Sequence, residues 1–244
     1  MRDAAPPRSE RFEPLRVLAR EADAMRRQSA LLAGGVARRG VQLSARGEAE
    51  DVVFFVHGVL ATAGVFSPIE RALRRAGVAH FASFSYHPWR SIASLVQELK
   101  REVRAIPGRA RVHLVGHSLG GIVARAYVHE AGGHARVAQT ISLASPFHGT
   151  ALARIARAGV VRELRPDSEL LARLRSPLGQ PRVRHTSFVA ADDLVIQPAM
   201  SAAFPHGEVI VVERAGHNGL LFDPSVAEAI ARRVRAFEPA RPAA

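Results

Sequence analysis

The chain has 244 residues, of which 48% are hydrophobic, so it is long enough to bury a sizeable core and is not globally disordered. Cysteine is absent, which excludes disulfides, thiolate metal sites and cysteine nucleophiles together. The formal net charge of +12 comes from arginines scattered along the chain, with Lys100 as the sole lysine and no basic stripe interleaved with aromatic residues. We therefore interpret the charge as a solvated basic surface and expect no nucleic-acid partner.

The N-terminal part of the chain has the pattern of a helix. Residues 11–33 have a helical period, and five apolar side chains fall roughly on one face: Phe12, Leu15, Leu18, Met25 and Leu32. We predict an N-terminal helical extension over residues 1–48 that packs on the main domain. The alternative is a basic amphipathic helix that makes peripheral contact with a membrane.

The sequence gives no sign of a membrane-spanning or exported protein. No segment reaches the ~18 apolar residues that a spanning helix needs. The charged N-terminus lacks the apolar region of a signal peptide, because the best apolar run nearby, residues 30–36, is too short. We expect a cytoplasmic protein, membrane-peripheral at most.

From residue 51 onward, predicted strands alternate with predicted helices. The strands are expected at 51–56, 78–86, 111–116, 137–144, 183–190 and 207–213, and the helices at 66–76, 91–105, 119–131 and 225–236. This alternation predicts an α/β protein with a doubly wound, mostly parallel sheet. We assign it to residues 49–238, with an insertion at about 150–182 that forms a small helical cap.

The sequence G-H-S-L-G at residues 116–120 joins a predicted strand directly to a predicted helix. A serine on such a turn is held in a strained conformation with its hydroxyl exposed. Side chains at Gly116 and Gly120 would collide with the neighbouring strand and helix, so both positions require glycine. The turn predicts a nucleophile elbow with Ser118 as the nucleophile.

A serine hydroxyl is a weak nucleophile and needs a base within hydrogen-bond reach. His217 follows the predicted strand 207–213 and lies between glycines, before the last helix. Asp192 and Asp193 follow the preceding strand, and either carboxylate could orient the imidazole. The order serine, aspartate, histidine is the one that this elbow architecture requires.

The oxyanion that forms during acyl transfer needs two backbone N–H donors. One is expected from Leu119, the residue after the nucleophile. The other is expected from Val59, in the loop after the first strand, where Gly58 would let the backbone approach the substrate closely.

Five motifs together resemble the lipase and esterase branch of the α/β-hydrolase superfamily: VHGVL, VGHSLGG, SPFHGT, AADDLV and RAGHNGLL. The chain is similar to small bacterial triacylglycerol lipases and to inositol-deacylase-like proteins over roughly residues 51–236. The resemblance implies the α/β-hydrolase fold. It also implies the following roles: Ser118 as nucleophile, His217 as base, Asp192 as acid with Asp193 left open, and Val59 and Leu119 as oxyanion donors.

These features predict a serine carboxylic-ester hydrolase that acts on lipid-like acyl esters through an acyl-enzyme. We expect no cofactor and no metal. Two alternatives remain: an acyltransferase with the same triad, and a non-catalytic α/β-hydrolase used as a binding module.

Overall fold

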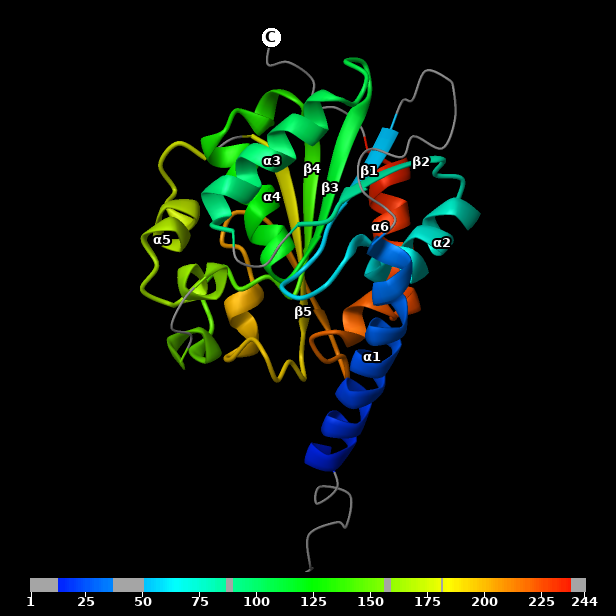
Figure 1. Ribbon diagram of the computed structural model, residues 1–244, viewed down its shortest axis with the longest axis vertical. Coiled ribbons are helices and arrows are strands. Elements are labelled where there is room, and N and C mark those ends of the chain that lie inside the picture. Colours follow the sequence, from blue (N-terminus) through cyan, green and yellow to red (C-terminus); the bar gives the residue numbers. More distant parts are fainter. Residues whose placement is uncertain (1–12, 37–50, 87–89, 156–158, 181, 238–244) are drawn as a thin grey trace, which may run out of the picture.

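The computed structural model describes residues 13–36, 51–86, 90–155, 159–180 and 182–237. Its centre is a six-stranded sheet with the order β2-β1-β3-β4-β5-β6, in which every neighbouring pair is parallel (Figure 1). The strands are β1 (Asp51–Val56), β2 (His80–Phe84), β3 (Arg111–His117), β4 (Val137–Leu143), β5 (Arg184–Ala190) and β6 (Glu208–Val212). The predicted doubly wound parallel sheet is confirmed.

Within the described residues, six α-helices accompany the strands: α1 (Glu13–Val36), α2 (Ser67–Arg75), α3 (Ile92–Arg104), α4 (Leu119–Glu130), α5 (Glu169–Arg175) and α6 (Pro224–Arg235). Helices α3 and α4 cover one face of the sheet, and α2 and α6 cover the other (Figure 1). Parallel strands must be joined by crossovers, and the two faces receive the crossover helices.

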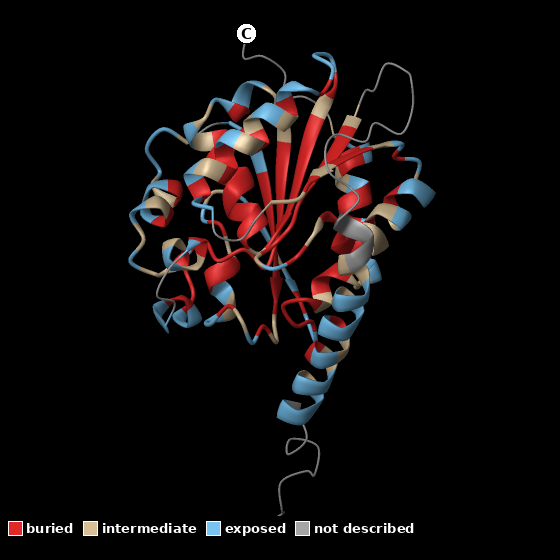
Figure 2. Ribbon diagram, viewed as in Figure 1, coloured by how far each residue is buried: buried red, intermediate tan, exposed pale blue. Residues whose placement is uncertain are grey.

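Strands β1, β3, β4 and β5 are buried almost along their whole length, whereas the edge strand β6 is largely exposed. Burial on both faces explains the continuous apolar run of β1. Along β1, Phe54 packs in the cluster under α3 and α4, whereas Phe55 packs in the cluster under α2 and α6. Figure 2 shows the sheet as the most deeply buried part of the molecule. Burying one such side chain fully contributes about 1.5–3 kcal/mol.

Local side-chain caps fix the starts of α3, α5 and α6, and in α5 the cap is Ser168 Oγ, which accepts from Leu171 N at 3.5 Å. Ser91 Oγ accepts a hydrogen bond from Ser94 N at 3.2 Å at the start of α3. At the start of α6, Asp223 Oδ1 accepts from Ser225 N at 2.8 Å, and Pro224 occupies the first helical position. Such caps stabilise a helix by about 1 kcal/mol.

The segment between β4 and β5, where a cap was expected, contains α5 and two 3₁₀ helices, Ala151–Ile155 and Val160–Leu164. Leu164 and Leu171 are buried and join the core cluster under α3 and α4. This segment is therefore packed on the body of the domain as well as lying beside the pocket described below.

Of the helical extension predicted over residues 1–48, the structure describes residues 13–36, which form α1, and the rest lies outside the described residues. Helix α1 docks on the domain through an unexpected face. Glu21 and Ala24 are buried, whereas Leu15, Leu18 and Met25 are 62%, 55% and 56% exposed.

Of the apolar stripe, Leu32 packs against the core, and Phe12 lies outside the described residues. The N-terminal turns of α1 extend beyond the rest of the domain (Figures 1 and 2). Among the described helices, none is long and apolar enough to cross a membrane.

Candidate active site

The strand order places a crevice between the loops that follow β1 and β3. From β1 the chain proceeds to β2 on one side, whereas β3 lies on the other side and continues the sheet towards β6. Ligands of open parallel sheets bind outside the carboxyl ends of the strands at such a switch point. Val56, the last residue of β1, is paired with Gly116, so the loop at residues 57–60 lies beside Ser118.

The turn at Ser118 is sterically demanding. Ser118 has φ 53° and ψ −121°, a conformation that side-chain-bearing residues rarely adopt and that costs on the order of 1–3 kcal/mol. A Cβ at Gly120 would lie 1.9 Å from the carbonyl oxygen of Val56, and one at Gly116 would lie 2.3 Å from Gly121 N. Both contacts are with backbone, which has no room to move aside. The expected reason for glycine at these two positions is therefore confirmed.

The structure brings His217 together with Asp193, and not with Asp192. His217 Nδ1 lies 2.9 Å from Asp193 Oδ2, and both side chains are buried. Asp193 Oδ1 accepts hydrogen bonds from the backbone N–H groups of Val195 and Ile196, each at 2.8 Å. Because an ionised carboxylate only accepts, His217 Nδ1 carries the proton, and its Nε2 is left as an acceptor.

The prediction that Asp192 orients the histidine is wrong. Asp192 is partly exposed and forms an ion pair with Arg20 of α1 at 3.3 Å. The chain turns after β5, where Asp193 N donates to Ala190 O, and this turn directs the second aspartate inward. The two carboxylates are adjacent in sequence, so the apolar pattern of the strand could not distinguish them.

His117 connects the nucleophile turn to the histidine loop. Its Nε2 donates to the carbonyl oxygen of His217 at 3.1 Å, and the two rings lie 4.9 Å apart. Burial, together with the nearby His217, lowers the pKa of His117 to about 3, so this ring is neutral. The sequence alone predicts no role for this side chain, although its place directly before Ser118 is visible in the motif.

His57 is held as part of the loop after β1. Its Nδ1 donates to the carbonyl oxygen of Gly58 at 2.8 Å, and its Nε2 accepts from the backbone N–H of Tyr86 at 3.3 Å. Its ring stacks on that of Tyr86 with centroids 4.1 Å apart. Burial lowers the pKa of His57 to about 4. Both ring nitrogens are occupied, which suits a residue that shapes the loop.

The two expected oxyanion donors flank the serine. Leu119 is the first residue of α4, and the first N–H groups of a helix have no acceptor within the helix. On the other side, a Cβ at Gly58 would lie 3.1 Å from Ser118 Cβ, so the loop carrying Val59 passes close to the serine. Val59 also lines the pocket in which Ser118 lies.

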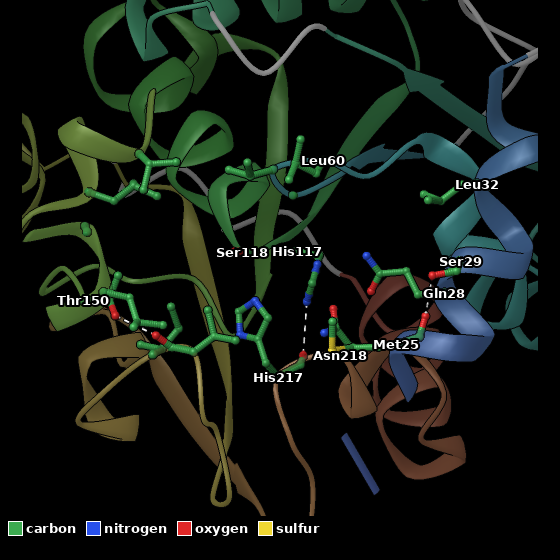
Figure 3. Close-up of a pocket in the computed structure, with 18 residues that line it drawn as sticks. Met25, Gln28, Ser29, Leu32, Leu60, His117, Ser118, Thr150, His217 and Asn218 are labelled. Carbon is green, nitrogen blue, oxygen red and sulfur yellow. Dashed lines mark hydrogen bonds between the residues drawn. The ribbon is translucent and has the colours of Figure 1, made fainter. Parts of the chain in front are cut away.

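Ser118 and His217 line one cavity of about 410 Å³ with a mainly apolar wall (Figure 3). Leu152, Val161 and other side chains of the segment between β4 and β5 form one side of it. Helix α1 forms another side, through four residues: Met25, Gln28, Ser29 and Leu32. The sequence analysis missed this wall, because the position of α1 depends on contacts with loops distant in the sequence.

A family model described as palmitoyl protein thioesterase matches residues 53–190, which is more than half of the chain. A search of curated proteins finds no match.

Several solved structures are similar to this chain. The mature Bacillus licheniformis lipase BlEst2 has a TM-score of 0.64 at 14% identity, and the match covers 78% of this chain and 94% of the lipase. A metagenomic carboxyl esterase has a TM-score of 0.60 at 19% identity, over 80% of this chain and 77% of the esterase. Est1E from Butyrivibrio proteoclasticus, solved with ferulic acid bound, has a TM-score of 0.58 at 10% identity, over 81% and 92%. At these identities, the similarity establishes a shared fold.

The buried neutral histidines predict that the protein loses stability in mild acid. Below pH 6.5 the unfolded chain binds protons at His57 and His117, whereas the folded protein does not until about pH 4 and pH 3. Stability is therefore fully present above about pH 6.5 and falls as the pH decreases towards those values. Each histidine contributes a slope of up to about 1.4 kcal/mol per pH unit. Burial of His185 acts in the same direction.

Urea unfolding at pH 7.5, 6.0 and 5.0 measures this slope, and His57→Gln should make it shallower. A free energy of unfolding that stays constant over this range would contradict the prediction.

Proposed function

Since the chain belongs to the palmitoyl protein thioesterase family and is a hydrolase with the α/β-hydrolase fold, we propose a specific reaction for it. We propose that it cleaves lipid-like acyl esters with a triad of Ser118, His217 and Asp193. The observation that carries the proposal is the buried pair of His217 Nδ1 and Asp193 Oδ2 at 2.9 Å, beside a serine in the strained elbow conformation. The nucleophile, the orienting acid and the base follow strands β3, β5 and β6, which is the chain order that the elbow architecture requires.

The proposed reaction has two halves. Ser118 Oγ attacks the carbonyl carbon of the ester while His217 Nε2 takes its proton. The tetrahedral intermediate collapses to an acyl-enzyme as the imidazolium returns the proton to the leaving alcohol or thiol. Water then attacks the acyl-enzyme, with His217 again accepting and returning the proton, and the free acid leaves.

Backbone donors stabilise the oxyanion in both halves. We assign this role to the N–H groups of Leu119 and Val59. The amino end of α4 adds its dipole, which favours negative charge at the same place. One such donor is worth roughly 10²–10³ in kcat in hydrolases of this kind.

Asp193 keeps the imidazole in the required tautomer and stabilises the imidazolium. Its second oxygen is held by two backbone N–H groups, so the carboxylate cannot rotate away from the histidine without losing both bonds.

The apolar pocket supports an acyl chain as the group that enters it. The cavity is lined by aliphatic side chains from α1 and from the segment between β4 and β5. The family's description names palmitoyl thioesters, which are long-chain substrates of this chemistry. We therefore include thioesters with oxygen esters in the substrate class.

We further propose that the exposed apolar stripe of α1 contacts the lipid surface that supplies the substrate. Leu15 and Leu18 are largely exposed on the projecting end of the helix, and Met25 continues the stripe to the pocket. Leu60, at 75% exposed, lies at the same pocket from the loop after β1. Amphipathic helices bind membranes through apolar side chains of this kind.

Replacing Ser118 tests the reaction itself. Wild-type protein should hydrolyse p-nitrophenyl esters, with the highest kcat/KM among the medium and long chains of a series from acetate to palmitate. Ser118→Ala should lose this turnover while keeping its circular dichroism spectrum, because the nucleophile is removed and the fold is not. Free acid should remain the main product when a simple alcohol is added. A Ser118→Ala variant with wild-type turnover would overturn the assignment.

The two adjacent aspartates provide a matched pair of variants. Asp193→Asn should lower kcat by roughly 10⁴-fold, as loss of the orienting carboxylate does in such triads. Asp192→Asn removes a carboxylate one residue away that pairs with Arg20 at the surface, so its kcat should stay close to that of the wild type. Equal losses in the two variants, measured with the same ester, would refute the assignment of Asp193.

Membrane contact is tested by co-sedimentation with vesicles of mixed zwitterionic and anionic phospholipids. Wild-type protein should sediment with the vesicles, and the double variant Leu15→Ser/Leu18→Ser should remain in the supernatant while hydrolysing a dissolved short-chain ester normally. The same change at Leu178, an exposed leucine in the loop after α5, should leave sedimentation unchanged. Wild-type protein that stays in the supernatant would count against the proposed contact.

A further inference from the structure

Helix α1 contacts the loop that carries His217 through a buried carboxylate. Glu21 is only 6% exposed. Its Oε1 accepts two hydrogen bonds from Asn218, one from the backbone N–H at 3.0 Å and one from the side-chain Nδ2 at 2.6 Å. A buried carboxyl group needs hydrogen-bond partners, and both bonds of Glu21 come from the residue next to the histidine, whereas its Oε2 has no hydrogen-bond partner among the described residues.

These bonds hold one particular peptide group. The carbonyl oxygen of His217 accepts from His117 Nε2 at 3.1 Å, and the N–H of the same peptide group, which belongs to Asn218, donates to Glu21. The peptide group is planar, so a bond at each side fixes the orientation of the whole plane. The direction in which the imidazole leaves the backbone depends on that plane.

The same carboxylate also contacts the residue before the histidine. A Cβ at Gly216 would lie 2.1 Å from Glu21 Oε2, so the carboxylate fills the space that a side chain at this position would need. Glu21 therefore touches the loop on both sides of His217. Arg20, the preceding residue of α1, pairs with Asp192 and donates to the carbonyl oxygen of Arg214 at 3.3 Å, so α1 also contacts both loops that bear the acid and the base.

We propose that Glu21 is a positioning residue for His217, so that α1 completes the active site of this hydrolase. Its effect passes through the peptide plane and the ring orientation, and Glu21 touches neither the serine nor the substrate. The proposal rests on the proposed function, in which His217 is the base. A displacement of the base by about 1 Å can cost on the order of 10²-fold in rate.

Three variants of α1 test the proposal. Glu21→Ala removes both bonds to Asn218, and we expect kcat to fall by roughly 10- to 10²-fold with KM unchanged, because substrate binding does not use this contact. Glu21→Gln retains an oxygen that accepts from Asn218 and should recover most of kcat. Asp23→Ala is the matched control, since Asp23 lies on the same helix and forms ion pairs with Arg26 and Arg27 of α1 itself. It should behave as the wild type.

Proton NMR provides a measurement that does not depend on turnover. The proton between His217 Nδ1 and Asp193 should give a downfield resonance, assigned by its loss in His217→Gln. In Glu21→Ala, this resonance should shift or broaden, and it should be unchanged in Glu21→Gln and Asp23→Ala. A residue that only stabilised the fold would lower the unfolding temperature and leave the resonance in place.

The proposal is overturned if Glu21→Ala retains both the wild-type kcat and the wild-type resonance, or if Asp23→Ala loses as much activity. A wild-type protein that hydrolyses no ester would contradict the proposed function, and the resonance would still decide whether Glu21 orients the ring. If Glu21→Ala does not fold, Asn218→Ala takes its place. It removes the 2.6 Å bond from the other side and should lower kcat and shift the resonance, and a wild-type result for both would reject the proposal.

Discussion

The site depends on the close approach of two stretches of backbone, the end of β1 and the first turn of α4. The distance between Gly120 and the carbonyl oxygen of Val56 leaves no room for a side chain. This approach brings the loop after β1 beside the nucleophile turn and keeps Ser118 in a conformation that an isolated chain would avoid. The two segments lie at the centre of the parallel sheet, where β1 pairs with β3 and the strands are buried.

The two other groups of the proposed triad are held by several partners each. Asp193 is fixed by two backbone N–H groups and by the imidazole, and His217 is fixed by Asp193 at its ring and by His117 at its carbonyl oxygen. A base held from several sides loses little entropy when the reaction requires one orientation. His117 is neutral, which suits the proposed role of His217 as base. A positive charge on His117 would oppose protonation of the neighbouring His217 to the imidazolium.

Helix α1 combines two roles on its two faces. Its inner face binds the histidine loop through Glu21 and lines the pocket through Gln28 and Leu32. Its outer face leaves Leu15 and Leu18 exposed, and the proposed lipid contact uses them. A single helix would then link the surface from which the substrate comes to the loop that carries the base. Leu15 and Leu18 of the apolar stripe that is visible in the sequence lie on the outer face, whereas Leu32 of the same stripe packs against the core, so the stripe does not identify the docking face.

The fold and the nucleophile turn follow from the sequence, because they depend on local sterics and on the alternation of apolar runs. The strands, the helices and the two glycines around Ser118 could be predicted from such patterns. The choice between Asp192 and Asp193 could not be predicted from the sequence. The two carboxylates are adjacent, and the conformation of the turn after β5 determines which of them points inward to His217.

The contacts of His117 with His217 and of Glu21 with Asn218 could not be predicted from the sequence either, since they join residues 100 and 197 positions apart. The sequence by itself determined which chemical groups are present and on which strand ends they lie. Only the tertiary structure decided which of them touch, because side-chain direction at a turn and the docking of a helix depend on packing between distant segments.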